Sequence, residues 1–276
     1  MSEAEKGGAK GRVSPMPHQP VQQTLFRLRV RYRKTGRLAY LGHLEVIHTI
    51  ERAVRRAGLP YAVTQGFSPH MRVGFSSALP VGTGSTCEYY DVFLTELVER
   101  GRALALLRAA TAPDLMPDAA GYIDVRTPAL TAQITRAVYR VELACDLAAD
   151  EVRAAMGRAV GRGNIPYTRG KKEKAMDLER TLAAWELEPA GAGALALELD
   201  TRCDNEGSLR PEIVLAALDR ELTGSAEPIV STGIQGLEAI ASYRVERTAQ
   251  MVGREDGTFA DPMPAFMTSE SAQLCS

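Results

Sequence analysis

Residues 26–33 read Phe-Arg-Leu-Arg-Val-Arg-Tyr-Arg, a strict alternation of apolar and cationic side chains. This period of two is typical of a β-strand, because successive side chains of a strand point to opposite faces of its sheet. One face of the strand is apolar and needs a core to cover it. The other face carries a row of four arginines, Arg27, Arg29, Arg31 and Arg33. The fold must therefore provide a sheet with at least one covered face.

Periodic segments further along the chain predict the other elements. The first part of the chain has helical spacing of apolar residues in two segments and strand-like segments in three more. These are the predicted helices 44–57 and 98–110 and the predicted strands 61–64, 88–94 and 116–125. The resulting order, β-α-β-β-α-β, is that of the split βαβ, or ferredoxin-like, module. A similar pattern follows, with predicted strands 137–143, 194–200 and 239–248 and predicted helices 149–160 and 210–222.

We therefore predict an α+β fold of two tandem ferredoxin-like (split βαβ) modules with antiparallel sheets. Polar composition with Gly and Pro, and no apolar periodicity, predicts a disordered tail at each end. The expected organisation is a tail over 1–22, an N-terminal module over 23–128, a C-terminal module over 129–250 and a tail over 251–276. Pro211 suits the first position of the last helix, where its missing N–H costs nothing.

The most distinctive stretch is the block over 66–82, Gly-Phe-Ser-Pro-His-Met-Arg-Val-Gly-Phe-Ser-Ser-Ala-Leu-Pro-Val-Gly. Its glycines and prolines fix many backbone angles, while its Phe, Met, Val and Leu side chains argue against disorder. We predict an ordered loop with a short strand that forms the functional surface. Within it we expect Phe75 to lie in the core and Phe67 to contact a partner. The alternative is that the whole block is scaffold, since apolar residues usually lie inside.

Three segments carry a family resemblance: TGRLAYLGHLE in 35–45, GFSPHMRVGFSSALPVG in 66–82 and EYYDVFL in 88–94. Together they resemble the uncharacterised radical-SAM-associated (radical-SAM-linked) protein family, most strongly over 25–94. This chain has Gly42 and Ser68 where that family more usually has Ser and Asn. The resemblance implies a setting near RNA metabolism or translation, and a separate radical SAM protein with a cobalamin-binding-type region as a partner. It supplies no catalytic residue.

Charge is distributed unevenly along the chain. The net charge is −1, yet residues 25–75 hold ten Lys or Arg against Glu45 and Glu51, a local charge of +8 that leaves −9 elsewhere. A local field of this size attracts phosphate groups even when the whole protein is nearly neutral.

The four cysteines, Cys87, Cys145, Cys203 and Cys275, do not have metal-ligand spacing. Because no Cys triplet for an iron–sulfur cluster is present, we expect that the chain is not itself a radical SAM enzyme, and we expect no metal and no cofactor. Reduced thiols in a cytoplasmic protein are the expectation. The N-terminal residues lack the apolar region of a signal peptide, and no window reaches the ~18 apolar residues of a membrane helix.

We interpret the arginine row as a phosphate-binding surface, because an Arg guanidinium binds phosphate through two parallel hydrogen bonds. Further cations lie near the row in sequence, namely Lys34, Arg37, Arg52, Arg55, Arg56 and Arg72. The alternative is a solvated strand face whose charges discourage edge pairing. RNA is favoured over duplex DNA because split βαβ sheets commonly present such a face to single strands. The predicted RNA-binding residues are Arg29, Arg31, Arg33, Lys34, Arg37, Phe67, His70, Arg72 and, in a basic turn of the second module, Lys171 and Lys172.

His43 and His70 fall in the two distinctive segments, each close in sequence to an arginine. Histidine beside arginine suits general acid–base chemistry on RNA, which makes these two the candidate catalytic residues. The alternative is structural, because a lone His at a helix start is more often a hydrogen-bond partner. Strand alternation also places Asp91 on the face of Tyr89, where a buried carboxylate needs a partner.

The functional hypothesis is an RNA-binding accessory protein that presents RNA to, or works with, a separate radical SAM enzyme in RNA modification or processing. Two alternatives stay open. One is a metal-independent endoribonuclease or RNA-modifying enzyme that uses His43 and His70. The other is a protein-interaction adaptor without nucleic acid.

Overall fold

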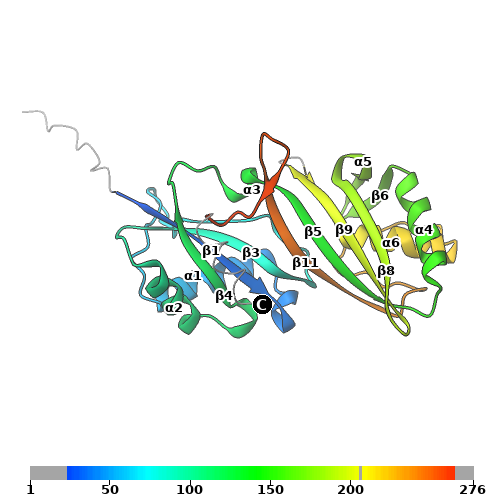
Figure 1. The fold of residues 1–276 in the computed structure, drawn as a ribbon, viewed down its shortest axis with the longest axis horizontal. Helices are drawn as coiled ribbons and strands as arrows, with labels where there is room; N and C mark the ends of the chain where they lie inside the picture. Colours follow the sequence, from blue (N-terminus) through cyan, green and yellow to red (C-terminus); the bar gives the residue numbers. More distant parts are fainter. Residues whose placement is uncertain (1–23, 205–206, 265–276) are drawn as a thin grey trace, which may run out of the picture.

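The structure, a computed structural model, describes residues 24–204 and 207–264 (Figure 1). Over these residues, ten strands form one continuous sheet. The first half of the chain contributes β1 (Phe26–Lys34), the 3-10 helix η1 (Gly36–Tyr40), α1 (His43–Arg56), β2 (Val73–Phe75), β3 (Thr83–Leu94), α2 (Arg100–Ala110), the 3-10 helix η2 (Pro113–Leu115) and β4 (Pro117–Ile123).

The second half of the chain adds further strands of the same sheet and a separate hairpin, β6–β7. In order, its elements are α3 (Leu130–Gln133), β5 (Ile134–Ala144), α4 (Ala149–Gly161), β6 (Asn164–Arg169), β7 (Lys172–Asp177), α5 (Leu178–Thr181), β8 (Leu182–Gly191), β9 (Ala194–Asp204), β10 (Gly207–Ser208), α6 (Pro211–Thr223), β11 (Ser242–Gly253) and β12 (Phe259–Ala260).

Strand pairing joins the two halves. In the first half, β4 pairs with β1, β1 with β3 and β3 with β2, all antiparallel. In the second half, β11 pairs with β5, β5 with β9 and β9 with β8, again antiparallel. The halves meet where residues 245–247 of β11 run parallel to residues 83–85 of β3. The predicted α+β class and mainly antiparallel pairing are confirmed, but both halves share one sheet through a parallel contact.

The predicted helices of ten residues or more are confirmed, with ends that move by at most two residues. Pro211 occupies the first turn of α6, as expected, and Gly224 ends that helix in the left-handed conformation. The strand predicted over 61–64 is wrong, because Tyr61 and Val63 form isolated bridges rather than a strand. The second strand of the fold is β2, which lies inside the glycine-rich block and takes the place beside β3.

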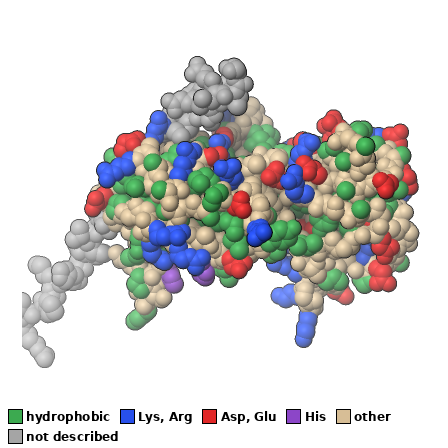
Figure 2. All heavy atoms as spheres, turned by 90° about the horizontal axis from the view of Figure 1, so that it is seen from below, with side chains coloured by type: hydrophobic (Ala, Val, Ile, Leu, Met, Phe, Trp, Pro, Cys, Tyr) green, Lys and Arg blue, Asp and Glu red, His purple; other side chains and the backbone are tan. Residues whose placement is uncertain are grey.

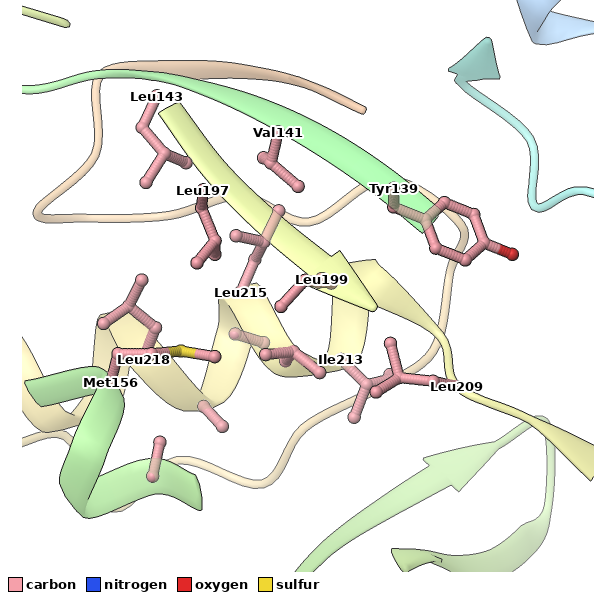
Figure 3. Packing of buried hydrophobic residues seen from close by; sticks show 14 of the residues in the cluster. Tyr139, Val141, Leu143, Met156, Leu197, Leu199, Leu209, Ile213, Leu215 and Leu218 are labelled. Carbon is pink, nitrogen blue, oxygen red and sulfur yellow. The ribbon is translucent and has the colours of Figure 1, made fainter. Parts of the chain in front are cut away.

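Apolar side chains of the sheet pack against the helices on one face. In the first half, Leu28, Val30 and Val92 are fully buried in a cluster that also contains side chains of α1 and α2. Figure 3 shows the corresponding cluster of the second half, where Leu197 and Leu199 of β9 lie over Leu215 and Leu218 of α6. Full burial of a Leu or Val stabilises the folded chain by about 1.5–3 kcal/mol each. These two clusters hold the helices on the sheet.

The four long helices, α1 and α2 of the first half and α4 and α6 of the second, lie on the same face of the sheet. Glu88 and Tyr90 are two residues apart on β3, so their side chains point to the same face. Tyr90 belongs to the cluster under α1. In the same way, Arg247 and Val245 share a face of β11, and Val245 belongs to the cluster with α6. The Arg247 guanidinium and the Glu88 carboxylate form a buried ion pair of 2.6 Å, so they share one face. This ion pair therefore crosses the boundary between the two halves on the helical side.

The opposite face of the first half is covered by α3 and by the segment after β11. Met263 is buried there with Tyr89, Leu130 and Ile134. The prediction of a disordered tail is therefore wrong for residues 251–264, which complete β11, form β12 and cover the sheet. Apolar side chains were too few in this segment for composition to reveal it. The predicted tail over 1–22 and residues 265–276 lie outside the described residues.

Candidate nucleic-acid interface

The arginine row of β1 is divided between a buried part and an exposed part. Arg27 and Arg29 both bind the Asp91 carboxylate, with N–O distances of 2.7 and 2.8 Å. Arg29 also donates to the Gln133 side chain at 3.0 Å and to the Pro262 carbonyl at 2.8 Å, and it is 2% exposed. The predicted RNA contact through Arg29 is therefore wrong. Asp91 lies directly opposite Arg29 in the β1–β3 register, and it supplies the partner that a buried carboxylate needs.

The end of β1 places its cations differently. Arg31 is partly exposed and pairs with Asp118 at 2.9 Å and with Asp261 at 3.5 Å, while Arg33 is exposed. Lys34 is 2% exposed, and its ammonium donates to the Ala39 carbonyl at 2.8 Å. Burial lowers the pKa of Lys34 to about 8. The prediction that Lys34 contacts phosphate is wrong, because this ammonium holds η1 against β1.

Exposed cations gather on α1 instead. Its outward side carries Leu44, His48, Arg52 and Arg55, three or four residues apart, and Arg56 follows. We call His48, Arg52, Arg55 and Arg56 the α1 basic face. Arg55 makes an exposed ion pair of 3.4 Å with Glu51, a contact of low energy that leaves the guanidinium accessible. Figure 2 shows Lys and Arg side chains beside histidine side chains on the half that holds α1. Arg37, one of the predicted RNA-binding residues, is exposed on η1, directly before α1.

The start of the glycine-rich block forms a projecting loop. Residues 62–64 and 70–72 are joined by backbone hydrogen bonds, from Thr64 N–H to the His70 carbonyl and from Arg72 N–H to the Ala62 carbonyl, each 2.8 Å. Phe67 lies between them and is fully exposed. We call residues 61–73 the aromatic hairpin. The expectation that Phe67 is free to contact a partner is consistent with this position.

His70 and Arg72 are exposed on the aromatic hairpin, as a contact role requires. The His70 imidazole lies 3.2 Å from the Ser68 hydroxyl. The Arg72 guanidinium lies over the Phe93 ring, 4.2 Å from its centroid. This stacking orients the guanidinium while leaving its edge accessible.

His43 has different surroundings from His70. It is half-buried at the start of α1, where its ring and the Phe75 ring are nearly perpendicular, with 6.0 Å between their centroids. Burial lowers the pKa of His43. The hollow beside it, with Lys34 and Glu88, measures about 10 Å³, which is room for a single water. His70 does not line this hollow. The joint catalytic role of His43 and His70 stays a prediction. Phe75 is half-buried against the core, and its ring centroid lies 5.9 Å from that of Tyr90.

A buried polar network at the junction of the halves was not foreseen. The Arg247 guanidinium binds Glu88 and also donates to the Ser77 carbonyl at 2.8 Å. Gln250 donates to the Cys87 carbonyl at 2.7 Å. These contacts anchor the loop after β2 to the second half. The partners are about 160 residues apart in sequence, which is why local patterns gave no signal for them.

The β6–β7 hairpin presents Lys171 and Lys172 at its turn, and both are exposed. We call residues 164–177 the lysine hairpin. It is held to the body by Thr168, which donates through its backbone N–H to the Ile229 carbonyl and accepts from the Ser231 N–H, each at 2.8 Å. On the face drawn in Figure 2, Lys and Arg side chains also project from the second half. The basic turn predicted here is confirmed as an exposed one.

Metal ligation and membrane insertion find no support within the described ranges. Over residues 24–204 and 207–264, no group of three or more His, Cys, Asp or Glu side chains is arranged to hold a metal ion. No helix in the same part of the chain has the length and apolar character needed to cross a membrane.

Comparison with known proteins gives one clear match. The model of the family described as "Uncharacterized protein conserved in bacteria (DUF2344)" matches residues 27–211. No curated protein matches the chain.

Solved structures give distant likenesses. A Cbf5-Nop10-Gar1 complex aligns with a TM-score of 0.41 at 8% identity, covering 81% of this chain and 48% of the other. An H/ACA RNP bound to a substrate RNA containing 2'-deoxyuridine aligns at 0.38 and 10%, covering 81% and 47%. An unknown protein from Galdieria sulphuraria aligns at 0.23 and 10%, covering 82% and 100%. The chain spans about half the length of the first two. At these TM-scores the likenesses support no argument about fold or function.

Proposed function

Since the chain belongs to the DUF2344 family of uncharacterized bacterial proteins, whose description assigns no activity, we propose its function from its surface: it binds single-stranded RNA. The observation that carries the proposal is the α1 basic face together with the aromatic hairpin, since Val54 of α1 and Met71 of the hairpin belong to the same buried cluster. Arg37, on η1 directly before α1, adds a further exposed cation. Arginines that track a phosphate backbone next to an exposed aromatic ring are the usual features of single-strand binding.

The position of the cations supports this choice over the sheet face that sequence analysis favoured. Arg52 donates to Thr49 of its own helix at 3.0 Å, which holds its guanidinium at the surface. Arg72 is kept extended by its stacking on Phe93. Such exposed guanidinium groups suit sequence-independent contacts to phosphate. The face of β1, by contrast, is filled by the Asp91 ion pairs.

The aromatic hairpin supports contact with a base rather than with phosphate alone. Phe67 is fully exposed at its tip, and Val63 is also exposed. Stacking of an unpaired base on such a ring contributes about 1–3 kcal/mol and tolerates any base. An exposed large apolar side chain on a projecting loop otherwise favours a protein partner.

We further propose that this RNA-binding protein is an accessory one, which presents RNA to a separate radical SAM enzyme. The family resemblance over residues 25–94 supports this, as do the positions of the described cysteines. Cys87 and Cys145 are buried in the cores of different halves, so we assign iron–sulfur chemistry to another chain.

We also propose that each half is a split βαβ module. The strand orders β4-β1-β3-β2 and β11-β5-β9-β8 support it, because each corresponds to the order 4-1-3-2 within its own half. The lysine hairpin and α5 are then an insertion between the helix α4 and the strand β8 of the second module.

RNA binding is tested by charge reversal on the α1 basic face. The variant Arg52→Glu with Arg55→Glu is compared with wild type for a labelled single-stranded RNA of about 16 nucleotides, by fluorescence anisotropy. We expect weaker binding and a salt dependence whose slope falls by about 0.7 for each lost phosphate contact. Both residues are exposed, so the fold should be kept, and circular dichroism checks this.

The matched control reverses two other exposed arginines, Arg126 in the loop after β4 and Arg254 in the turn after β11. Arg126→Glu with Arg254→Glu changes the net charge equally and should leave the slope unchanged. If both double variants bind RNA like wild type, the RNA surface is elsewhere. If no form of the protein binds RNA, the adaptor hypothesis is favoured.

A further inference from the structure

A cavity of about 310 Å³ opens where the two halves meet, and we call it the junction pocket. Tyr40 of η1 and Gly82 before β3 line it from the first half. Glu212 of α6, the loop over 233–241 and Tyr243 of β11 line it from the second half. Its volume is at the low end of the range for small-molecule sites, so it suits one small planar group.

Glu212 gives the pocket a specific chemical character. The side chain is 2% exposed, and its Oε1 accepts a hydrogen bond from the Arg210 guanidinium at 3.0 Å. Its Oε2 has no hydrogen-bond partner among the described residues. Buried polar atoms are almost always paired, so an unpaired carboxylate oxygen on a residue that lines a cavity points to a donor supplied by a ligand. Burial also raises the pKa of Glu212.

Two tyrosines add flat apolar surface to the pocket. The Tyr40 side chain is 61% exposed at its rim. Tyr243 is held in place because its hydroxyl accepts a hydrogen bond from the Gln235 N–H at 2.6 Å. Gly82 allows Ile234 of the pocket loop to pack closely against the first half, since a Cβ at this position would lie 2.9 Å from Ile234 Cγ1. Tyrosine rings beside a small cavity suit stacking on a nucleobase.

Cationic residues lie on both sides of the pocket. Arg37 is on η1, the same 3-10 helix as Tyr40, and is exposed. On the other side, the lysine hairpin is bonded through Thr168 to residues 229 and 231, directly before the pocket loop. An RNA strand whose phosphates contact η1 and the lysine hairpin would carry one base over the junction pocket between them.

We propose that the junction pocket takes one unstacked base of a bound RNA, and that this base is guanine. The Watson–Crick edge of guanine presents two neighbouring N–H donors, at N1 and at the exocyclic amine. They match the two oxygens of the Glu212 carboxylate, of which Oε1 keeps a second lone pair beside its bond from Arg210. Adenine, cytosine and uracil each place an acceptor on that edge, against the carboxylate. This inference rests on the proposed RNA-binding function and adds a base preference to it.

The test compares labelled octauridine with the same octamer carrying one central guanosine, inosine or adenosine. We expect wild type to bind the guanosine octamer about tenfold or more tightly than octauridine or the adenosine octamer. Inosine lacks the exocyclic amine and should fall between guanosine and adenosine. Glu212→Gln keeps the shape of the side chain but turns an amide N–H toward the ligand donors. It should lower the affinity for the guanosine octamer to that of octauridine.

Two further variants keep the test decisive. Tyr40→Ala changes an exposed residue, should fold normally and should weaken binding of the guanosine octamer about tenfold. Glu227→Gln removes an exposed carboxylate outside the pocket and should change nothing. Equal binding of all octamers by wild type would overturn the guanine pocket while leaving RNA binding intact. A guanosine preference that survives in Glu212→Gln would overturn the role of Glu212. Failure to bind any octamer would instead count against the proposed function itself.

Discussion

Arg29 and Arg52 carry the same cationic group but meet different surroundings. The Arg29 guanidinium is buried and bonded to Asp91, Gln133 and the Pro262 carbonyl. Arg52 is exposed on α1 and bonded to Thr49. A buried guanidinium that loses its carboxylate is strongly destabilising, by about 3–5 kcal/mol, whereas an exposed one contributes little to stability. The fold therefore depends on the contacts of Arg29 being kept, whereas Arg52 is free to meet a phosphate.

Lys34 should make stability depend on pH in an unusual direction. Burial lowers its pKa from 10.5 to about 8 in the folded protein. Between these pH values the unfolded chain binds more protons than the folded one, so the free energy of unfolding rises with pH. Below about pH 8 both forms are protonated and the burial of the charge is a constant cost. We expect wild type to gain stability relative to Lys34→Met as pH is raised from about 8 to about 10.

Urea unfolding at several pH values measures this difference. Lys172→Met provides the control, because Lys172 is exposed and its replacement should leave the difference from wild type constant with pH. A difference between wild type and Lys34→Met that stays flat, or that shrinks with rising pH, would contradict the buried, cationic Lys34 described above.

The glycine-rich block works as two elements with different environments. Its first part forms the aromatic hairpin, which carries Phe67 out into solvent. Its second part forms β2, which brings Phe75 against Tyr90 and His43. A strand and a projecting loop within one block explain why it is both apolar and rich in glycine.

Substitution of the two phenylalanines should separate these environments. Phe75→Ala should destabilise the protein by about 2–3 kcal/mol, below the value of about 3–5 kcal/mol for a fully buried Phe, because Phe75 is half-buried. Phe67→Ala should leave the melting temperature unchanged and weaken RNA capture about tenfold. Thermal unfolding and anisotropy measured on the same samples give both quantities. If Phe67→Ala lowers the melting temperature and leaves RNA capture intact, the hairpin is scaffold.

Local patterns predicted the elements better than the partners of each face. The alternation in residues 26–33 predicted β1 and its apolar face correctly, because that pattern depends on neighbouring residues alone. What covers the arginine face depends on Asp91, Gln133 and Pro262, which are 62 to 233 residues away from Arg29. The cations of the α1 basic face were accessible to sequence reasoning: Arg52 and Arg55 were counted among the neighbours of the arginine row, although they were not predicted as RNA contacts. The junction pocket could not be predicted from local patterns, because its walls come from both halves.

At the scale of the whole molecule, the two halves are built as one unit. The sheet runs through the parallel contact of β3 with β11, and the Glu88–Arg247 ion pair crosses the same boundary. The segment after β11 returns to the first half, where Met263 and the Pro262 carbonyl cover the buried arginines. A chain connected in this way should unfold in a single cooperative transition.

The single tryptophan, Trp185 of β8, reports on the second half and allows a test of this coupling. Leu28→Ala removes a fully buried side chain from the first half and should cost about 2–5 kcal/mol. We expect the urea midpoint followed by Trp185 fluorescence to move as far as the midpoint followed by circular dichroism. Leu97→Ala, at an exposed position, should move neither. A Trp185 midpoint that does not respond to Leu28→Ala would mean that the halves unfold independently.

The most direct test of RNA binding at this surface is photo-cross-linking of bound RNA that contains 4-thiouridine. Trypsin releases Phe67 in the peptide 57–72, and Tyr40 with His48 in the peptide 38–52. We expect mass spectrometry to find the nucleotide on these two peptides, since they carry the aromatic hairpin, the rim of the junction pocket and part of the α1 basic face. Cross-links confined to other peptides, or none in a sample where RNA is bound, would contradict the proposed interface.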